Sequence, residues 1–131
     1  MDEKAKGLTQ YRLQRAKEDL DDAKLLYTNN RFLSANNRAY YSIFHAIKAV
    51  LSIERVDFKK HKDVTAYFNK NYVNTNIFPK KMGRKIGQAF RVREDSDYED
   101  EYEVNPETTR LQIETAEELI ELVEKYIEDK I

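Results

Sequence analysis

The sequence has 131 residues, of which 36% are charged, with no Cys, three Gly and two Pro. This length suits one domain over residues 1–131, and the lack of Cys excludes a disulfide framework and a thiolate metal site. No apolar run reaches the roughly 18 residues that span a bilayer, and the start has no signal-peptide core, so we expect a cytoplasmic protein without a membrane partner.

The net charge of −1 conceals an uneven distribution along the chain. Residues 1–53 carry a balance of +3, residues 54–93 carry +8 and residues 94–131 carry −12. The middle segment could bind a polyanion such as RNA, which the C-terminal segment would repel. The two segments could equally pair with each other, within one subunit or between subunits. The sequence leaves both interpretations open.

The first half of the chain predicts a hairpin of two helices. Apolar residues recur every three or four positions over residues 7–28, at Leu8, Tyr11 or Arg12, Ala16, Leu20, Ala23 and Tyr27. Asn29 and Asn30 predict the end of this helix and the start of a second one, because Asn adopts left-handed backbone angles and also caps helices. The second helix, residues 31–53, carries a broad apolar stripe of Tyr40, Ile43, Phe44, Ile47, Val50 and Leu51. Two such helices with so short a turn should lie antiparallel.

The middle of the chain predicts two further helices. Residues 54–60 indicate a loop, and residues 61–72 indicate a short third helix. Its apolar face consists of Val64, Tyr67, Phe68 and Tyr72. Pro79 suits the first turn of a basic fourth helix over residues 79–93, with Ile86 and either Ala89 or Phe90 facing inward.

The end of the chain predicts a loop and a last helix. Residues 93–105 are acidic, rich in Tyr and without helical apolar spacing, which indicates a loop. Asn105 as N-cap and Pro106 at the first helical position begin the last helix. Its apolar residues recur at Ile113, Ala116, Ile120, Val123 and Ile127. Since no alternating strand pattern occurs, the sequence predicts an all-α, up-and-down helical bundle of about five helices.

Arg38 and His45 are the candidate catalytic pair. They are seven residues apart, so on a helix they lie within about 20° of each other, two turns apart on one face. His titrates near neutral pH, and Arg offers a planar fork to phosphate oxygens. Together they have the groups for metal-independent cleavage of a phosphodiester, one moving a proton and the other stabilising charge. The same spacing also occurs in ordinary surface pairs and in buried, hydrogen-bonded His residues.

Other polar residues have both a functional and a structural interpretation. Tyr41 could reach the same site as Arg38 or pack as a core aromatic. His61, in a Lys-rich run, could hold a phosphate or simply begin a helix. Asp97 could brace Arg93 or cap the basic helix. The two His are sixteen residues apart and no acidic run has the spacing of a calcium loop, so we expect no metal and no cofactor.

The stretch Asn37-Arg38-Ala39-Tyr40-Tyr41-Ser42-Ile43-Phe44-His45 resembles a motif of small stand-alone HEPN-domain proteins, Asn-Arg-x-Tyr-Tyr-x-x-Phe-His. The resemblance continues at Lys60-His61-Lys62 and at an Arg-x-x-x-Asp-Tyr signature formed by Arg93, Asp97 and Tyr98. It extends over about residues 8–128.

This resemblance implies a four-helix HEPN-like bundle with an added short helix, commonly a homodimer. Many members are ribonucleases of toxin–antitoxin or defence systems, in which an Arg and a His from both subunits cut RNA without metal. Arg38 and His45 match that pair here, with Asn37 and Tyr41 in support. The partner is often a small antitoxin resembling a nucleotidyltransferase.

Two functions therefore stay open. The first is a dimeric, metal-independent endoribonuclease toxin with His45 as general acid or base, Arg38 stabilising charge and the basic middle segment holding RNA. The second is a non-catalytic helical module that partners a nucleotidyltransferase-like protein or binds a nucleotide. The position of His45 discriminates between them, because a catalytic imidazole must face a groove and a structural one can be sealed in the core.

Overall fold

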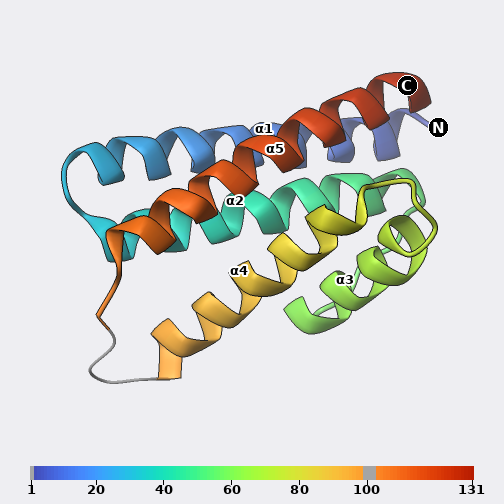
Figure 1. Ribbon diagram of the computed structural model, residues 1–131. Coiled ribbons are helices and arrows are strands. Elements are labelled where there is room, and N and C mark those ends of the chain that lie inside the picture. The colour runs from blue at the N-terminus through green and yellow to red at the C-terminus, as the bar shows by residue number, and fades with distance from the viewer. Residues whose placement is uncertain (1, 99–102) are drawn as a thin grey trace.

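The computed structural model describes residues 2–98 and 103–131, with positions 97 and 98 described by their backbone alone (Figure 1). These ranges contain the helices α1 (Glu3–Thr28), α2 (Phe32–Ile53), α3 (His61–Phe68), α4 (Lys80–Tyr98) and α5 (Pro106–Lys130). A π-helical turn, Asn69–Val73, continues α3. No strand occurs in the described ranges. The prediction of an all-α bundle of about five helices is confirmed.

Helix α2 lies at the centre of the bundle. It contacts α1, α3, α4 and α5. Helices α1 and α5 run beside it on one side, and α3 and α4 lie on the other, with both chain ends at the same end of the bundle (Figure 1). No helix within the described residues combines the length and the apolar character that crossing a bilayer requires.

Local signals in the sequence account for the helix boundaries. Asn30 adopts φ 60°, the left-handed geometry that lets the chain reverse between α1 and α2. The Asn105 side chain accepts a hydrogen bond from the Glu107 N–H at 2.8 Å, and Pro106 opens α5 as predicted. Helix α1 begins four residues before the predicted start, because the Asp2 carboxylate caps it by accepting from the Ala5 N–H at 2.8 Å.

Three details of the sequence prediction are wrong. Helix α4 continues to Tyr98, five residues beyond its predicted end at 93 and into the stretch predicted as a loop. A helical turn that faces solvent needs no apolar residue, so the spacing of apolar residues could not reveal that the helix continues there. Leu8 was expected to face inward but is 42% exposed, and of the two alternatives at the next position Tyr11 is 58% exposed, whereas the Arg12 side chain is only 14% exposed. The third helix also ends at Phe68, where the hydrogen bonding changes to a π turn.

Small residues let α1 and α2 approach closely. Ala16 and Ala23 on α1, and Ala39, Ala46 and Ala49 on α2, are fully buried. The Ser42 hydroxyl donates to the Ala16 carbonyl at 2.7 Å, a bond that only tightly packed helices allow. All six residues of the predicted α2 stripe are buried as well. The close approach brings the polar edges of α1 and α2 within reach of each other, and these edges form the candidate site.

Gly83 marks a second close approach, between α4 and the π turn. A Cβ at this position would lie 2.7 Å from Val73 Cγ1, closer than two non-bonded carbon atoms pack. We expect Gly83→Ala to lower the free energy of unfolding by about 1 kcal/mol, since overpacking outweighs the better helix propensity of Ala. Gly7→Ala, with nothing within 4 Å of the added methyl, should instead raise it by about 0.5–1 kcal/mol. Urea unfolding measures both, and equal stability of the two variants would contradict this packing.

Candidate active site

A single carboxylate joins Arg38 to His45. Asp19 lies on α1, and its side chain is only 5% exposed. Its Oδ1 accepts a hydrogen bond from Arg38 Nη1 at 3.2 Å, and its Oδ2 lies 3.6 Å from His45 Nε2. Because one carboxylate reaches both side chains, Arg38 and His45 lie on the same side of α2, as their spacing predicts. Asp19 belongs to none of the sequence motifs described above.

His45 is half-buried and not sealed. Its side chain is 24% exposed and that of Arg38 is 38% exposed. The ring packs beside Tyr41 and Phe44, with ring centroids 6.3 and 6.1 Å away. The imidazole thus has protein on one side and solvent access on the other, which is the position that the ribonuclease hypothesis requires within one chain.

The surroundings of His45 favour its neutral form. Burial is the main cause that lowers the pKa of His45 from 6.5 to about 4, and four cations act in the same direction: Arg15, Lys48, Arg12 and Arg38. The Asp19 carboxylate alone would raise the pKa of His45. Its influence is weakened because Asp19 already pairs with Arg38 and burial raises the pKa of Asp19 itself, so the downward shift prevails. At pH 7 the imidazole is therefore neutral and can accept a proton.

Two polar rows line the seam between α1 and α2. On α1 the row is Arg12, Arg15 and Asp19, and on α2 it is Arg38, Tyr41, His45 and Lys48. The spacing of three and four residues places each row along one edge of its helix. This spacing is the sequence signal that could have revealed Asp19 and Arg15, had the two helices been aligned antiparallel and compared.

The cations of this seam differ in how far they are neutralised. Arg12 Nη1 donates to the Ser52 hydroxyl at 2.6 Å, and Asp57 pairs with both Arg12 and Lys48, at 3.1 and 3.2 Å. Arg15 is exposed, donates to the Tyr11 hydroxyl at 3.3 Å and forms no ion pair with any described side chain. Arg15 is thus the cation beside His45 that is most accessible to an incoming anion.

Asn37, Tyr41 and Arg93 form a second cluster next to the first. Arg93 donates to the Asn37 side-chain oxygen at 3.2 Å and to the Tyr41 hydroxyl at 3.3 Å. The guanidinium groups of Arg93 and Arg38 each lie 5.1 Å from the centroid of the Tyr41 ring. Tyr41 therefore links the two clusters, and Asn37 contacts Arg93. The side chains of Asp97 and Tyr98, predicted to act with Arg93, lie outside the described residues.

His61 lies among aromatic rings. Its Nδ1 is 3.0 Å from the Tyr40 hydroxyl, and its ring centroid is 4.1 Å from that of Phe44. Burial lowers the pKa of His61, and Arg93 and Lys48 contribute in the same direction. These are the contacts of a packed ring at the start of α3, and we expect a structural role for His61.

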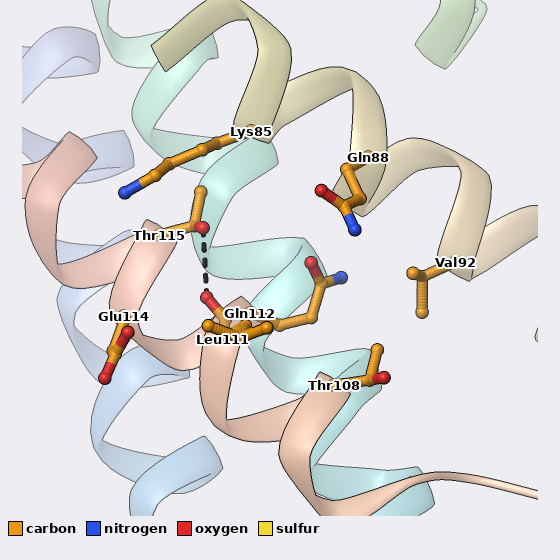
Figure 2. A pocket seen from close by; sticks show the side chains of 8 residues that line it. All are labelled: Lys85, Gln88, Val92, Thr108, Leu111, Gln112, Glu114 and Thr115. Atoms are coloured by element: carbon orange, nitrogen blue, oxygen red, sulfur yellow. Dashed lines mark hydrogen bonds between the residues drawn. The ribbon is translucent and has the colours of Figure 1, made fainter. Parts of the chain in front are cut away.

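A hollow of about 110 Å³ lies apart from these clusters, between α4 and α5 (Figure 2). Gln88 and Gln112 reach toward it from the two helices, and Gln112 Nε2 donates to the Ala89 carbonyl at 3.5 Å. Neither Arg38 nor His45 lines this hollow. Nor do any three His, Cys, Asp or Glu side chains in the described part of the chain gather to hold a metal ion. The hollow is therefore not the candidate active site.

Among the described residues, the basic middle segment 54–93 and the acidic C-terminal segment 94–131 meet in one ion pair. Lys85 on α4 lies 2.8 Å from Glu118 on α5, within one chain. Exposed cations of α4 such as Lys80, Lys81 and Arg84 form no ion pair with the described side chains. Pairing within the chain thus accounts for part of the charge asymmetry and leaves basic surface on α4.

Comparison with known proteins places this arrangement in context. A family model described as "HEPN domain" matches residues 9–126. A "UPF0332 protein" of Thermotoga maritima is 40% identical over 129 residues, which cover 98% of this chain and 97% of that protein. The "Putative toxin MJ0605" of Methanocaldococcus jannaschii is 32% identical over 114 residues, 87% of this chain and 84% of that protein. The "Putative toxin MJ0142" of the same organism is 26% identical over 118 residues, 90% of this chain and 80% of that protein.

Proposed function

The chain belongs to the HEPN domain family, and from this premise we propose that it is a metal-independent endoribonuclease of the toxin type. The observation that carries the proposal is the accessible His45 beside Arg38, with both side chains next to the Asp19 carboxylate. The lowered pKa of His45 supports it, because a neutral imidazole can accept a proton. Two relatives bear the name of toxins, which supports the toxin class.

In this proposal His45 begins the reaction as general base. The neutral imidazole takes the proton of an RNA 2′-hydroxyl, whose oxygen attacks the adjacent phosphorus. The bond from phosphorus to the 5′-oxygen breaks, and the leaving oxygen takes a proton from the His45 imidazolium or from water. The products are a 2′,3′-cyclic phosphate and a 5′-hydroxyl.

Arg38 stabilises the charge that develops on the phosphate. It contacts Asp19 through Nη1, so other N–H groups of its planar fork can face the non-bridging oxygens. Arg15 and the exposed cations of α4 would hold the flanking phosphates of the RNA. Asn37 and Tyr41 support the site by holding Arg93 beside it.

The proposal includes a homodimer and an antitoxin. The Arg38 edge of α2 is partly exposed on one chain, and a second copy packed against it by a two-fold axis would form a cleft with two Arg–His pairs. A toxin requires a neutralising partner, and a nucleotidyltransferase-like protein is the partner we propose. Light scattering tests the dimer, and a monomer at assay concentrations would contradict it.

The proposed activity is tested by comparing RNA with DNA. Purified protein in EDTA should cut a single-stranded RNA and leave a DNA of the same sequence intact, because DNA lacks the 2′-hydroxyl nucleophile. Cleavage of both would indicate a contaminating nuclease. Intact RNA together with tight binding of a nucleotidyltransferase-like protein or a nucleotide would favour the non-catalytic module.

The rate of cleavage should be insensitive to mild acid, because a base of low pKa stays unprotonated there. The base works only when unprotonated, so kcat/KM should stay level as the pH falls and drop only near the His45 pKa of about 4. At pH 5.5, a histidine with the ordinary pKa would retain only about a tenth of its activity, whereas this site should retain nearly all of it. Cleavage rates between pH 4.5 and 8 check this prediction. A fall in kcat/KM centred near pH 6.5, the ordinary pKa of histidine, would contradict it.

A further inference from the structure

Asp19 has one oxygen without a hydrogen bond. Its carboxylate is almost fully buried, and Oδ2 has no hydrogen-bond partner among the described residues. A buried carboxylate oxygen without a donor is unfavourable, because it has lost its hydrogen bonds to water. His45 Nε2 lies 3.6 Å from Oδ2. A small rotation of either side chain would bring the two atoms to hydrogen-bond distance.

The charges around this contact determine where the His45 proton resides. Arg38 and Arg15 favour the ionised form of Asp19, whereas the neighbouring Asp22 and Glu18 disfavour it. Arg38 occupies Oδ1, so Oδ2 keeps its lone pairs toward His45. If Nε2 carried no proton, its own lone pair would face the carboxylate, which is repulsive. A proton on Nε2 turns the same contact into an attraction and satisfies Oδ2.

We propose that Asp19 is a positioning residue that keeps the proton of neutral His45 on Nε2, so that Nδ1 is the atom that accepts the proton of the RNA hydroxyl. The catalytic part of this inference rests on the proposed ribonuclease function. The same carboxylate also holds Arg38, and it thereby sets the distance between the base and the cation. Both groups are placed by a residue that touches neither RNA nor the reacting atoms.

Asp19→Asn tests this role with little change in shape. The Asn side-chain oxygen can still accept from Arg38, but its NH₂ group would replace Oδ2 and donate to Nε2. This bond forces the proton onto Nδ1 and removes the base from the reacting side. We expect kcat to fall about 100-fold with KM within about threefold. Asp21→Asn, the same change at an exposed α1 position, is the matched control and should keep the activity of the wild type.

The tautomer of His45 gives a readout that needs no RNA. Long-range ¹H–¹⁵N NMR spectra at pH 7.5 distinguish Nε2–H from Nδ1–H, and a His45→Gln variant separates the signals of His45 from those of His61. The wild type should show Nε2–H and Asp19→Asn should show Nδ1–H. Wild-type protein with Nδ1–H would overturn the proposal, as would an Asp19→Asn variant with full kcat. If Asp19→Asn does not fold, the wild-type tautomer decides alone.

These outcomes separate this inference from the proposed function. A wild-type protein that cuts no RNA would end the ribonuclease proposal and the catalytic meaning of Asp19. The NMR spectra would still report whether Asp19 holds the His45 proton. If the wild-type protein cuts RNA but its His45 carries the proton on Nδ1, the ribonuclease proposal stands and the proposed role of Asp19 is refuted.

Discussion

The His45→Ala variant is expected to cut RNA about 10²–10⁴-fold more slowly than the wild type, because in the proposed mechanism His45 is the group that takes the proton of the attacking hydroxyl. The side chain is only half-buried, and its pKa shows that the folded protein holds it neutral, so its removal deletes no ion pair at pH 7. The fold should therefore survive. Initial rates with a labelled RNA in EDTA measure the effect, and circular dichroism checks that the variant is folded.

His61→Ala is the matched control for this experiment. It removes the second imidazole of the chain, which packs beside Tyr40 and Phe44. We expect its cleavage rate to stay within about threefold of the wild type, provided that the variant folds. Equal loss of activity in the two variants would show that general damage to the fold, and not a missing base, is what the assay detects.

The largest expected loss of stability follows from Phe68→Ala. Phe68 is fully buried where α3 passes into the π turn, with ring centroids 5.5 Å from Tyr72 and 5.1 Å from Phe78. Truncation leaves a cavity in this aromatic cluster, and we expect the free energy of unfolding to fall by about 3–5 kcal/mol. Phe58→Ala, at a position 36% exposed, should cost about 1 kcal/mol or less.

Urea unfolding at pH 7 measures both Phe variants. A loss below about 1 kcal/mol for Phe68→Ala would mean that the cluster between α3 and α4 does not contribute to the stability of the core. A similar loss for both variants would mean that burial does not distinguish the two positions, contrary to the structure.

The sequence predicts a helix well where the buried face is apolar and the ends carry side-chain caps. Helix α5 meets both conditions, since Asn105 and Pro106 mark its start and its predicted apolar residues are all buried. The end of α4 lacks the first condition: residues 94–98 carry no apolar periodicity, so a helical turn there resembles a loop in the sequence. The exposure of Tyr11 has a related cause. Arg12 turns toward α2 and donates to Ser52, so at this point of α1 a polar residue faces the bundle and its neighbour Tyr11 faces outward.

The candidate site could be predicted in part for a similar reason. Arg38 and His45 belong to one helix, so their spacing alone shows that they share a face. Asp19 reaches them from another helix, and its contact with Arg38 spans nineteen residues of sequence. No local pattern reports such a contact. It depends on how α1 and α2 align in the folded chain, and a single sequence does not specify that alignment.

The two histidines also show that residue type alone does not identify a catalytic side chain. By residue type alone they are equivalent candidates. Packing distinguishes them: the Nδ1 of His61 meets a Tyr hydroxyl at 3.0 Å, while the Nε2 of His45 meets a buried carboxylate at 3.6 Å. Which imidazole can serve as a base is therefore a property of the tertiary structure.

The measurement that tests the central claim most directly is the chemistry of the RNA ends that the wild-type protein produces in EDTA. If His45 and Arg38 activate a 2′-hydroxyl, mass spectrometry should find fragments that end in a 2′,3′-cyclic phosphate, and an equal amount of His45→Ala should yield at least about 100-fold less of them in the same time. Fragments that carry a 3′-hydroxyl and a 5′-phosphate, or no fragments at all, would contradict the claim.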